Sequence, residues 1–106
     1  MGFQLGASLL DACVLSVLDK KDAYGYILTQ AMKKAVNISE STLYPVLRRL
    51  QKNNCLTTYD QPYQGRNRRY YKITNEGKMK LKEYRKAWIE YKTQIDSLVC
   101  GGEENE

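Results

Sequence analysis

The sequence predicts a mainly α-helical fold: a winged helix-turn-helix of three helices and a two-stranded β-wing, followed by a long C-terminal dimerisation helix. Three patterns carry this prediction. Apolar residues recur at helical spacing in three successive segments before residue 54, and two short runs of β-branched and aromatic residues follow. The last segment repeats apolar residues at alternating steps of three and four, which is typical of a helix that pairs with another helix.

The chain length limits this arrangement to one domain with an appendage. The 106 residues divide into a winged-helix unit over residues 1–73 and a C-terminal helix over residues 74–99. Residues 100–106 contain two glycines and three glutamates, so we expect a flexible acidic tail there.

The first two helices follow from the spacing of apolar side chains. Residues Ala7–Lys20 carry these side chains on more than a narrow stripe, which indicates contacts on two sides. Asp22 is the expected N-cap of a second helix, because its carboxylate can accept hydrogen bonds from the first free backbone N–H groups. That helix is predicted to run through Tyr24 and to end near Met32.

The third helix has a clear inner face, formed by Leu43, Leu47 and Leu50. Either Ser39 or Ser41 is expected to cap it, which places Pro45 close to the first turn, where a missing N–H costs little. Asn54 can adopt the left-handed conformation that ends a helix.

The outer face of this third helix is polar and basic. If the face is only solvated, its hydroxyls serve as caps. If it lies in a DNA major groove, short hydroxyls contact bases or phosphates and arginine can bind guanine. A helical wheel places Tyr44 at the boundary and the following residues outward: Ser41, Thr42, Pro45, Arg48, Arg49 and Lys52.

The wing is predicted from strands over residues 55–60 and 69–73, joined by a long basic loop, Gln61–Arg68. Strand alternation puts Tyr71 and Ile73 on the core side. Guanidinium groups bind phosphate through two N–H groups and fit the negative minor groove, although a merely solubilising loop is the alternative. Three arginines lie at or next to the loop: Arg66, Arg68 and Arg69.

The C-terminal helix is expected to begin after a Thr74 cap and to pair with a second copy of the chain. Its apolar seam consists of Leu81, Tyr84, Trp88, Tyr91, Ile95 and Leu98. Trp88 lies one turn from Tyr84 and from Tyr91. Two interpretations stay open for these three aromatic residues: packing between subunits, or a flat pocket that accepts a planar hydrophobic effector.

The net charge of the chain indicates which classes of binding partner to expect. The chain has a net charge of +5, and without the three glutamates of the tail the remaining 17 basic and 9 acidic residues give residues 1–100 a net charge of +8. A basic body indicates nucleic acid or an anionic membrane surface, and simple solubility explains it equally well.

Composition also excludes several kinds of site. The chain has no histidine, so histidine-based zinc sites and Ser–His or Cys–His catalysis are absent. Cys13, Cys55 and Cys100 have neither zinc-site spacing nor the even number of a disulfide framework. We therefore expect no enzyme activity, no metal and no cofactor, and a cytoplasmic protein with reduced thiols. No apolar run is long enough to span a bilayer, and residues 1–6 lack the features of a signal peptide.

Three strings give the chain a recognisable resemblance: AYGYIL at 23–28, STLYPVLRRLQKN at 41–53, and GRNRRYYKIT at 65–74, followed by Glu76 and Gly77. Over about residues 7–98 the chain resembles the PadR family of bacterial transcriptional regulators, in its small subfamily with a single C-terminal dimerisation helix. Two departures are visible. Asn54 stands where a glycine is usual, and Asn67 stands where a proline is common, which implies a more mobile wing.

The resemblance implies a homodimeric repressor that binds a palindromic DNA operator in the bacterial nucleoid and is released by a small hydrophobic or aromatic effector. Trp88 matches a tryptophan that lines the dimer pocket of drug-sensing relatives. The positions that match residues near DNA are Tyr24, Ser41, Thr42, Tyr44 and Arg48, with Arg66, Arg68 and Arg69 in the wing. The main alternative is a winged-helix protein-interaction module without sequence-specific DNA binding.

Overall fold

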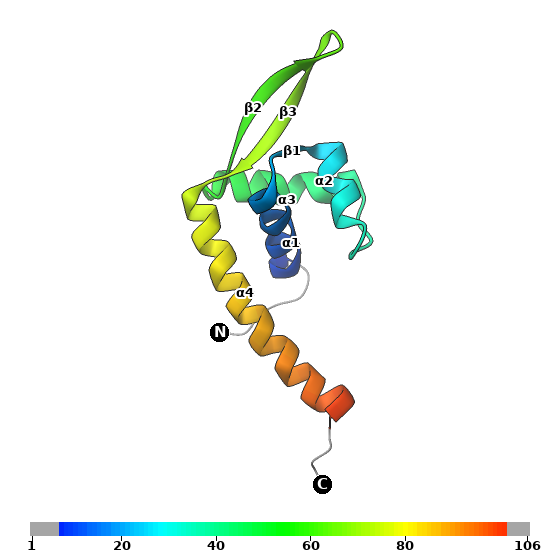
Figure 1. Ribbon diagram of the computed structural model, residues 1–106, viewed down its shortest axis with the longest axis vertical. Coiled ribbons are helices and arrows are strands. Elements are labelled where there is room, and N and C mark those ends of the chain that lie inside the picture. The colour runs from blue at the N-terminus through cyan, green and yellow to red at the C-terminus, as the bar shows by residue number, and fades with distance from the viewer. Residues whose placement is uncertain (1–6, 102–106) are drawn as a thin grey trace.

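The computed structural model describes residues 7–101 and confirms the mainly helical winged-helix fold (Figure 1). A helical body carries a β-hairpin at one end, and a long helix leads away from the opposite side. The acidic tail that we expected at the C-terminus lies largely outside the described residues, as do residues 1–6. The elements in chain order are α1 (Ala7–Lys20), β1 (Ala23–Tyr24), α2 (Gly25–Met32), α3 (Glu40–Lys52), β2 (Leu56–Tyr63), β3 (Arg66–Ile73), α4 (Asn75–Asp96) and the π-helical turn η1 (Ser97–Gly101).

The core forms where the apolar faces of the helices meet the base of the sheet. Helix α1 has the predicted bounds. The predicted inner face of α3 is buried, because its leucines recur at i, i+4 and i+7 and so share one side of the helix. The most completely buried side chains are Val14, Leu15, Leu18, Leu28, Leu43, Leu47 and Leu81.

The start of α2 differs from the prediction. Asp22 does not cap the helix; its Oδ2 accepts a hydrogen bond of 2.7 Å from the Tyr59 hydroxyl. Residues Ala23–Tyr24 form the short strand β1, which pairs with Tyr70 and Tyr71 of β3. Tyr24 takes the N-cap position without a side-chain cap bond. The pairing with β3 keeps the backbone extended through Tyr24, and this long-range contact is invisible in the local sequence.

Helix α3 begins at a serine cap and ends at an asparagine. The Ser39 hydroxyl accepts a bond of 3.3 Å from the Thr42 N–H, which confirms one of the two predicted caps. Pro45 is the sixth residue of the helix and so lies in its second turn, where it leaves the Ser41 carbonyl without its usual intrahelical donor. Asn54 has a φ of 68°, in the left-handed region as predicted.

The predicted long loop of the wing is wrong. Strands β2 and β3 continue to a two-residue turn, Gln64-Gly65, whose φ angles of 49° and 80° suit a tight hairpin. The three wing arginines therefore lie in β3. The strand order β1-β3-β2 makes β2 an edge strand, which is why it tolerates Pro62 opposite Asn67.

Helix α4 has two different halves. The Thr74 hydroxyl accepts a 2.9 Å bond from the Gly77 N–H, as predicted for the cap. Leu81 is 2 % exposed and belongs to the core of its own chain, so its assignment to the dimerisation seam is corrected. The later part of the helix leaves the body (Figure 1), and Ile89 and Ile95 are exposed there. Within residues 7–101, no helix is long and apolar enough to cross a membrane.

Candidate nucleic-acid interface

A polar groove of about 710 Å³ lies between α3 and the wing. Helix α3 supplies Tyr44, Arg48 and Gln51 to one wall, and the start of α2 closes one end. The sheet supplies Asp60, Asn67, Arg68, Arg69 and Tyr71 to the other wall. The groove therefore joins the polar face of α3 to two of the three wing arginines, Arg68 and Arg69, which the sequence predicted as separate features.

The outer face of α3 is arranged largely as predicted. Ser41, Thr42, Arg48 and Lys52 are exposed, and Tyr44 is 38 % exposed at the edge of this face. The hydroxyls form a small cluster, because Ser39 Oγ lies 3.0 Å from Ser41 Oγ and 3.2 Å from Thr42 Oγ1. Hydroxyls of this kind can donate to or accept from bases and phosphates.

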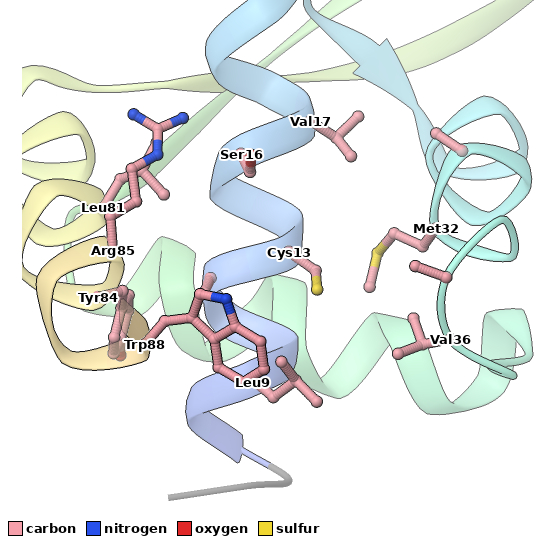
Figure 2. Close-up of a pocket in the computed structure, with 13 residues that line it drawn as sticks. Leu9, Cys13, Ser16, Val17, Met32, Val36, Leu81, Tyr84, Arg85 and Trp88 are labelled. Atoms are coloured by element: carbon pink, nitrogen blue, oxygen red, sulfur yellow. The ribbon is translucent and has the colours of Figure 1, made fainter. Parts of the chain in front are cut away.

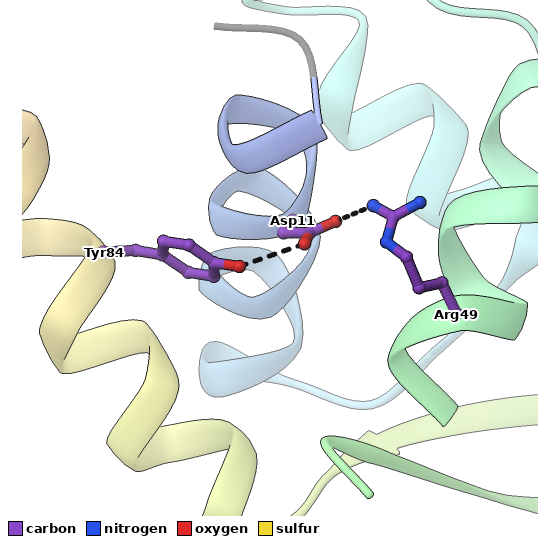
Figure 3. A network of polar contacts seen from close by, with 3 residues as sticks. All are labelled: Asp11, Arg49 and Tyr84. Atoms are coloured by element: carbon purple, nitrogen blue, oxygen red, sulfur yellow. Dashed lines mark hydrogen bonds and ion pairs between the residues drawn. The ribbon is translucent and has the colours of Figure 1, made fainter. Parts of the chain in front are cut away.

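Arg49 is the exception on this helix. It was expected to point outward with its neighbour Arg48, but it is half-buried and forms an ion pair with Asp11 of α1 (Figure 3). The helical wheel could not place Arg49 correctly, because its partner lies 38 residues away in the chain.

Asp11 joins three helices. The residue is 7 % exposed, and its carboxylate also accepts a 3.0 Å hydrogen bond from the Tyr84 hydroxyl of α4 (Figure 3). Burial, together with the charge and hydrogen bond of Asp11, raises the pKa of Tyr84 to about 12. The network connects α3 with the helix that leaves the body.

The wing arginines differ from one another. Arg66 is exposed beside the turn, and Arg69 lies 3.7 Å from the carboxylate of Asp60. Arg68 is half-buried, with its guanidinium carbon 4.1 Å from the ring centroid of Tyr24 and 3.5 Å from that of Tyr63. The three arginines, which are one cluster in the sequence, therefore have three different environments in the structure.

A row of tyrosines continues from Arg68 across the sheet. Tyr24 meets Tyr70 edge to face at 5.5 Å, and Tyr70 stacks on Tyr59 at 5.4 Å with 9° between the ring planes. The Tyr59 hydroxyl donates to Asp22, and this hydrogen bond raises the pKa of Tyr59. The row connects all three strands and stiffens the wing.

A second, apolar pocket of about 600 Å³ lies between α1, the end of α2 and α4 (Figure 2). Of the predicted effector residues, Trp88 and Tyr84 line it, whereas Tyr91 lies outside it with its ring 6.1 Å from that of Trp88. Cys13 and Met32 line the pocket as well, and burial raises the pKa of the Cys13 thiol. Figure 2 shows Trp88 reaching from α4 towards Leu9 of α1.

Several groove residues were missed by the sequence analysis. Gln51, Asp60 and Asn67 line the groove, and Tyr63 contacts Arg68. The alternation of side chains along a strand could have placed the wing residues, but only if the turn had been located at Gln64-Gly65.

A model of the PadR-like family of transcriptional regulators matches residues 14–83. The chain belongs to this family. An uncharacterized protein of Lysinibacillus sphaericus is 38 % identical to this PadR-like chain over 97 residues, covering 87 % of the chain and 89 % of the relative. The transcriptional regulator Rv3488 of Mycobacterium tuberculosis is 33 % identical over 75 residues, covering 70 % of each chain.

Solved structures agree with the family. The smu.1704 protein of Streptococcus mutans is 42 % identical to the PadR-like chain, with a TM-score of 0.84 over 95 % of each chain. PadR of Bacillus subtilis, solved in complex with operator DNA, is 23 % identical with a TM-score of 0.67, over 72 % of this chain and 45 % of that one. The latter likeness concerns the fold. The family consists of transcriptional regulators, in agreement with the expectation that the chain is not an enzyme.

Proposed function

We propose that the chain is a repressor that binds a palindromic operator as a homodimer and is released by a small planar hydrophobic effector. The observation that carries the proposal is the groove between α3 and the wing, whose walls bring Arg48 and Arg69 together. Membership in a family of transcriptional regulators supports it, as does the operator complex of the Bacillus subtilis relative with the same fold.

The two walls of the groove have different tasks in this proposal. Helix α3 enters the major groove, where Ser41 and Thr42 near its N-terminus reach base edges. Phosphate contacts position the protein without reading sequence. We assign that role to Arg48, Lys52, Arg66, Arg68 and Arg69, with Tyr24 and Tyr44 at the edge of the interface.

Dimerisation is assigned to the second half of α4. This half and the turn η1 that follows it carry large apolar side chains that the body of the chain leaves exposed, including Ile95 of α4 at 37 % and Leu98 of η1 at 81 %. A helix with such a side chain on each turn is stabilised when a second helix covers it. Trp88, Tyr91, Ile95 and Leu98 are the proposed contacts, and Tyr84 lies at the inner end of the seam.

The apolar pocket is the proposed effector site. Trp88 and Tyr84 offer flat aromatic surfaces there, and Cys13 and Met32 offer polarisable sulfur. An effector releases DNA only if it binds the DNA-incompetent arrangement more tightly than the competent one. Titration of planar cationic dyes and phenolic compounds against Trp88 fluorescence tests the site, and an unchanged signal across such a panel contradicts it.

The DNA-binding proposal is tested with duplex DNA from the promoter region of the protein's own gene and a shuffled duplex of equal length. We expect tighter binding to the first duplex in a gel-shift experiment. The affinity is expected to fall steeply between about 50 and 200 mM salt, because phosphate contacts release counterions. Absent or salt-independent binding favours the protein-interaction module instead.

A further inference from the structure

The contact between Arg68 and two tyrosines joins the three strands of the sheet. Tyr24 comes from β1, Arg68 from β3 and Tyr63 from β2. The guanidinium carbon lies over both rings, at 4.1 Å and 3.5 Å from their centroids. An arginine over an aromatic face gains from the negative potential of the ring, and the contact leaves the N–H groups at the guanidinium edge available to an anion.

The tyrosines are themselves held in place. Tyr24 packs edge to face against Tyr70, which in turn stacks on Tyr59. Tyr63 is the last residue of β2 and pairs with Arg66 in the hairpin register, directly before the tight turn. Arg68 is therefore positioned by neighbours that the sheet fixes, rather than by a flexible loop.

Arg68 differs from three other described arginines, because it has no acidic partner among the described residues. Arg69 has Asp60 as a partner, Arg49 has Asp11 and Arg85 has Asp19. Among the described residues, no carboxylate lies within ion-pair distance of Arg68. The positive charge of Arg68 is therefore held in place by the tyrosines without being neutralised by a carboxylate.

A hollow of about 460 Å³ lies beside this guanidinium at the end of the wing. Arg66 and Asn67 line it together with Arg68 and the two tyrosines. Of the described residues that line this hollow, none is acidic. Two guanidinium groups and the side-chain amides of Gln64 and Asn67 around an open hollow suit a phosphate group, which accepts several hydrogen bonds and carries a negative charge.

We propose that Tyr24 and Tyr63 are positioning residues that hold the Arg68 guanidinium ready for a backbone phosphate of the DNA. This inference rests on the proposed function and deepens it, because it assigns the wing a prearranged phosphate site. An arginine that is ordered before binding loses less conformational entropy when the complex forms. The contribution expected from one such side chain is about a 2- to 10-fold change in affinity.

The test compares full-length variants by fluorescence anisotropy on the promoter duplex over a range of salt concentrations. Tyr63→Leu is expected to weaken binding about 2- to 10-fold without changing the salt slope, because the charge of Arg68 remains. Tyr63→Phe keeps the ring face and is expected to restore wild-type affinity. Arg68→Ala is expected to weaken binding and to lower the salt slope by about 0.9, the effect of one lost phosphate contact.

The double variant Tyr63→Leu/Arg68→Ala shows whether Tyr63 affects DNA binding only through Arg68. We expect it to bind as Arg68→Ala does, because the tyrosine acts only through the arginine. Additive losses, or wild-type affinity of Tyr63→Leu, overturn the inference while the proposed function stands. If the wild-type protein does not bind the duplex at all, the proposed function fails and the inference fails with it. Equal thermal unfolding midpoints of all variants show that the fold is retained.

Discussion

At the scale of single residues, Asp11 connects three helices through its side-chain contacts. It is a buried carboxylate with partners on two other helices, Arg49 and Tyr84. Removing either partner leaves an incompletely satisfied charge, which costs more than the contact itself contributes. We therefore expect this network to act on stability and on the relative placement of α3 and α4, not on direct contact with DNA.

The Tyr84 hydroxyl makes this network measurable through its pH dependence. Its pKa is raised from 10.0 to about 12 in the folded chain, so the folded state holds the proton more tightly than the unfolded state. The resulting stability is complete below pH 10 and is lost as the pH rises towards 12. The wild-type protein should lose about 1 kcal/mol more than Tyr84→Phe between pH 9 and pH 11, measured by urea unfolding. Tyr26→Phe, at an exposed tyrosine, is the control; equal losses in all three proteins contradict the prediction.

Gly77 supports a second prediction at this scale. In an exposed helix position, Gly→Ala stabilises by up to about 1 kcal/mol. Here a Cβ atom would lie 2.3 Å from the Cys55 carbonyl oxygen, which already accepts the Thr74 N–H. Gly77→Ala should therefore destabilise the protein by about 1–3 kcal/mol, the usual cost of overpacking. Chemical denaturation measures the change, and Lys78→Ala on the exposed side should remain near the wild-type value; a stabilised Gly77→Ala protein refutes this close approach.

At the scale of elements, α3 has two arginine positions with separate roles. Arg48 faces the groove, and Arg49 faces Asp11. Arg48→Ala is expected to lower the salt slope of DNA binding by about 0.9 with little loss of stability. Arg49→Ala is expected to lower the unfolding free energy by about 1–3 kcal/mol while leaving that slope unchanged. Gel-shift titrations and denaturant unfolding of the same two variants measure both effects, and a reversed pattern contradicts the assignment.

The elements also show which features can be predicted from the sequence. Helices α1 and α3 follow from local periodicity, and the N-cap of α3 follows from the nearby Ser39 side chain. Strand β1 and the Arg49–Asp11 pair depend on partners far along the chain, so no local pattern could predict them. The predicted wing loop is too long because Pro62 counts as a loop residue in the sequence, whereas the edge strand β2 tolerates it.

For the C-terminal helix, too, the local sequence predicts the helix but not what each of its side chains contacts. Its apolar spacing predicts one long helix, and α4 confirms the helix, although Leu98 lies in the π-helical turn η1 that follows it. The spacing cannot say which part of the seam packs on the chain's own body. Leu81 is buried there, whereas Ile95 is 37 % exposed.

At the scale of the whole molecule, the shape argues for a partner chain. The radius of gyration is 16.2 Å, whereas a compact chain of this length has about 13 Å. The principal extents of 64 × 25 × 21 Å reflect the wing at one end and α4 at the other (Figure 1). A projecting helix with apolar side chains is poorly stabilised alone, and a second copy placed against it would set the distance between two DNA-reading helices.

Two substitutions in α4 separate folding from assembly. Leu81→Glu puts a charge into the core, where desolvation of a carboxylate is costly, so we expect loss of the folded state. Ile95→Glu puts the same charge on the projecting half, so we expect a folded monomer. Gln94→Glu adds one charge beside the seam and should remain dimeric. Sedimentation velocity with circular dichroism distinguishes these results. A dimeric Ile95→Glu protein would place the dimer contact elsewhere, and a folded Leu81→Glu monomer would return Leu81 to the seam.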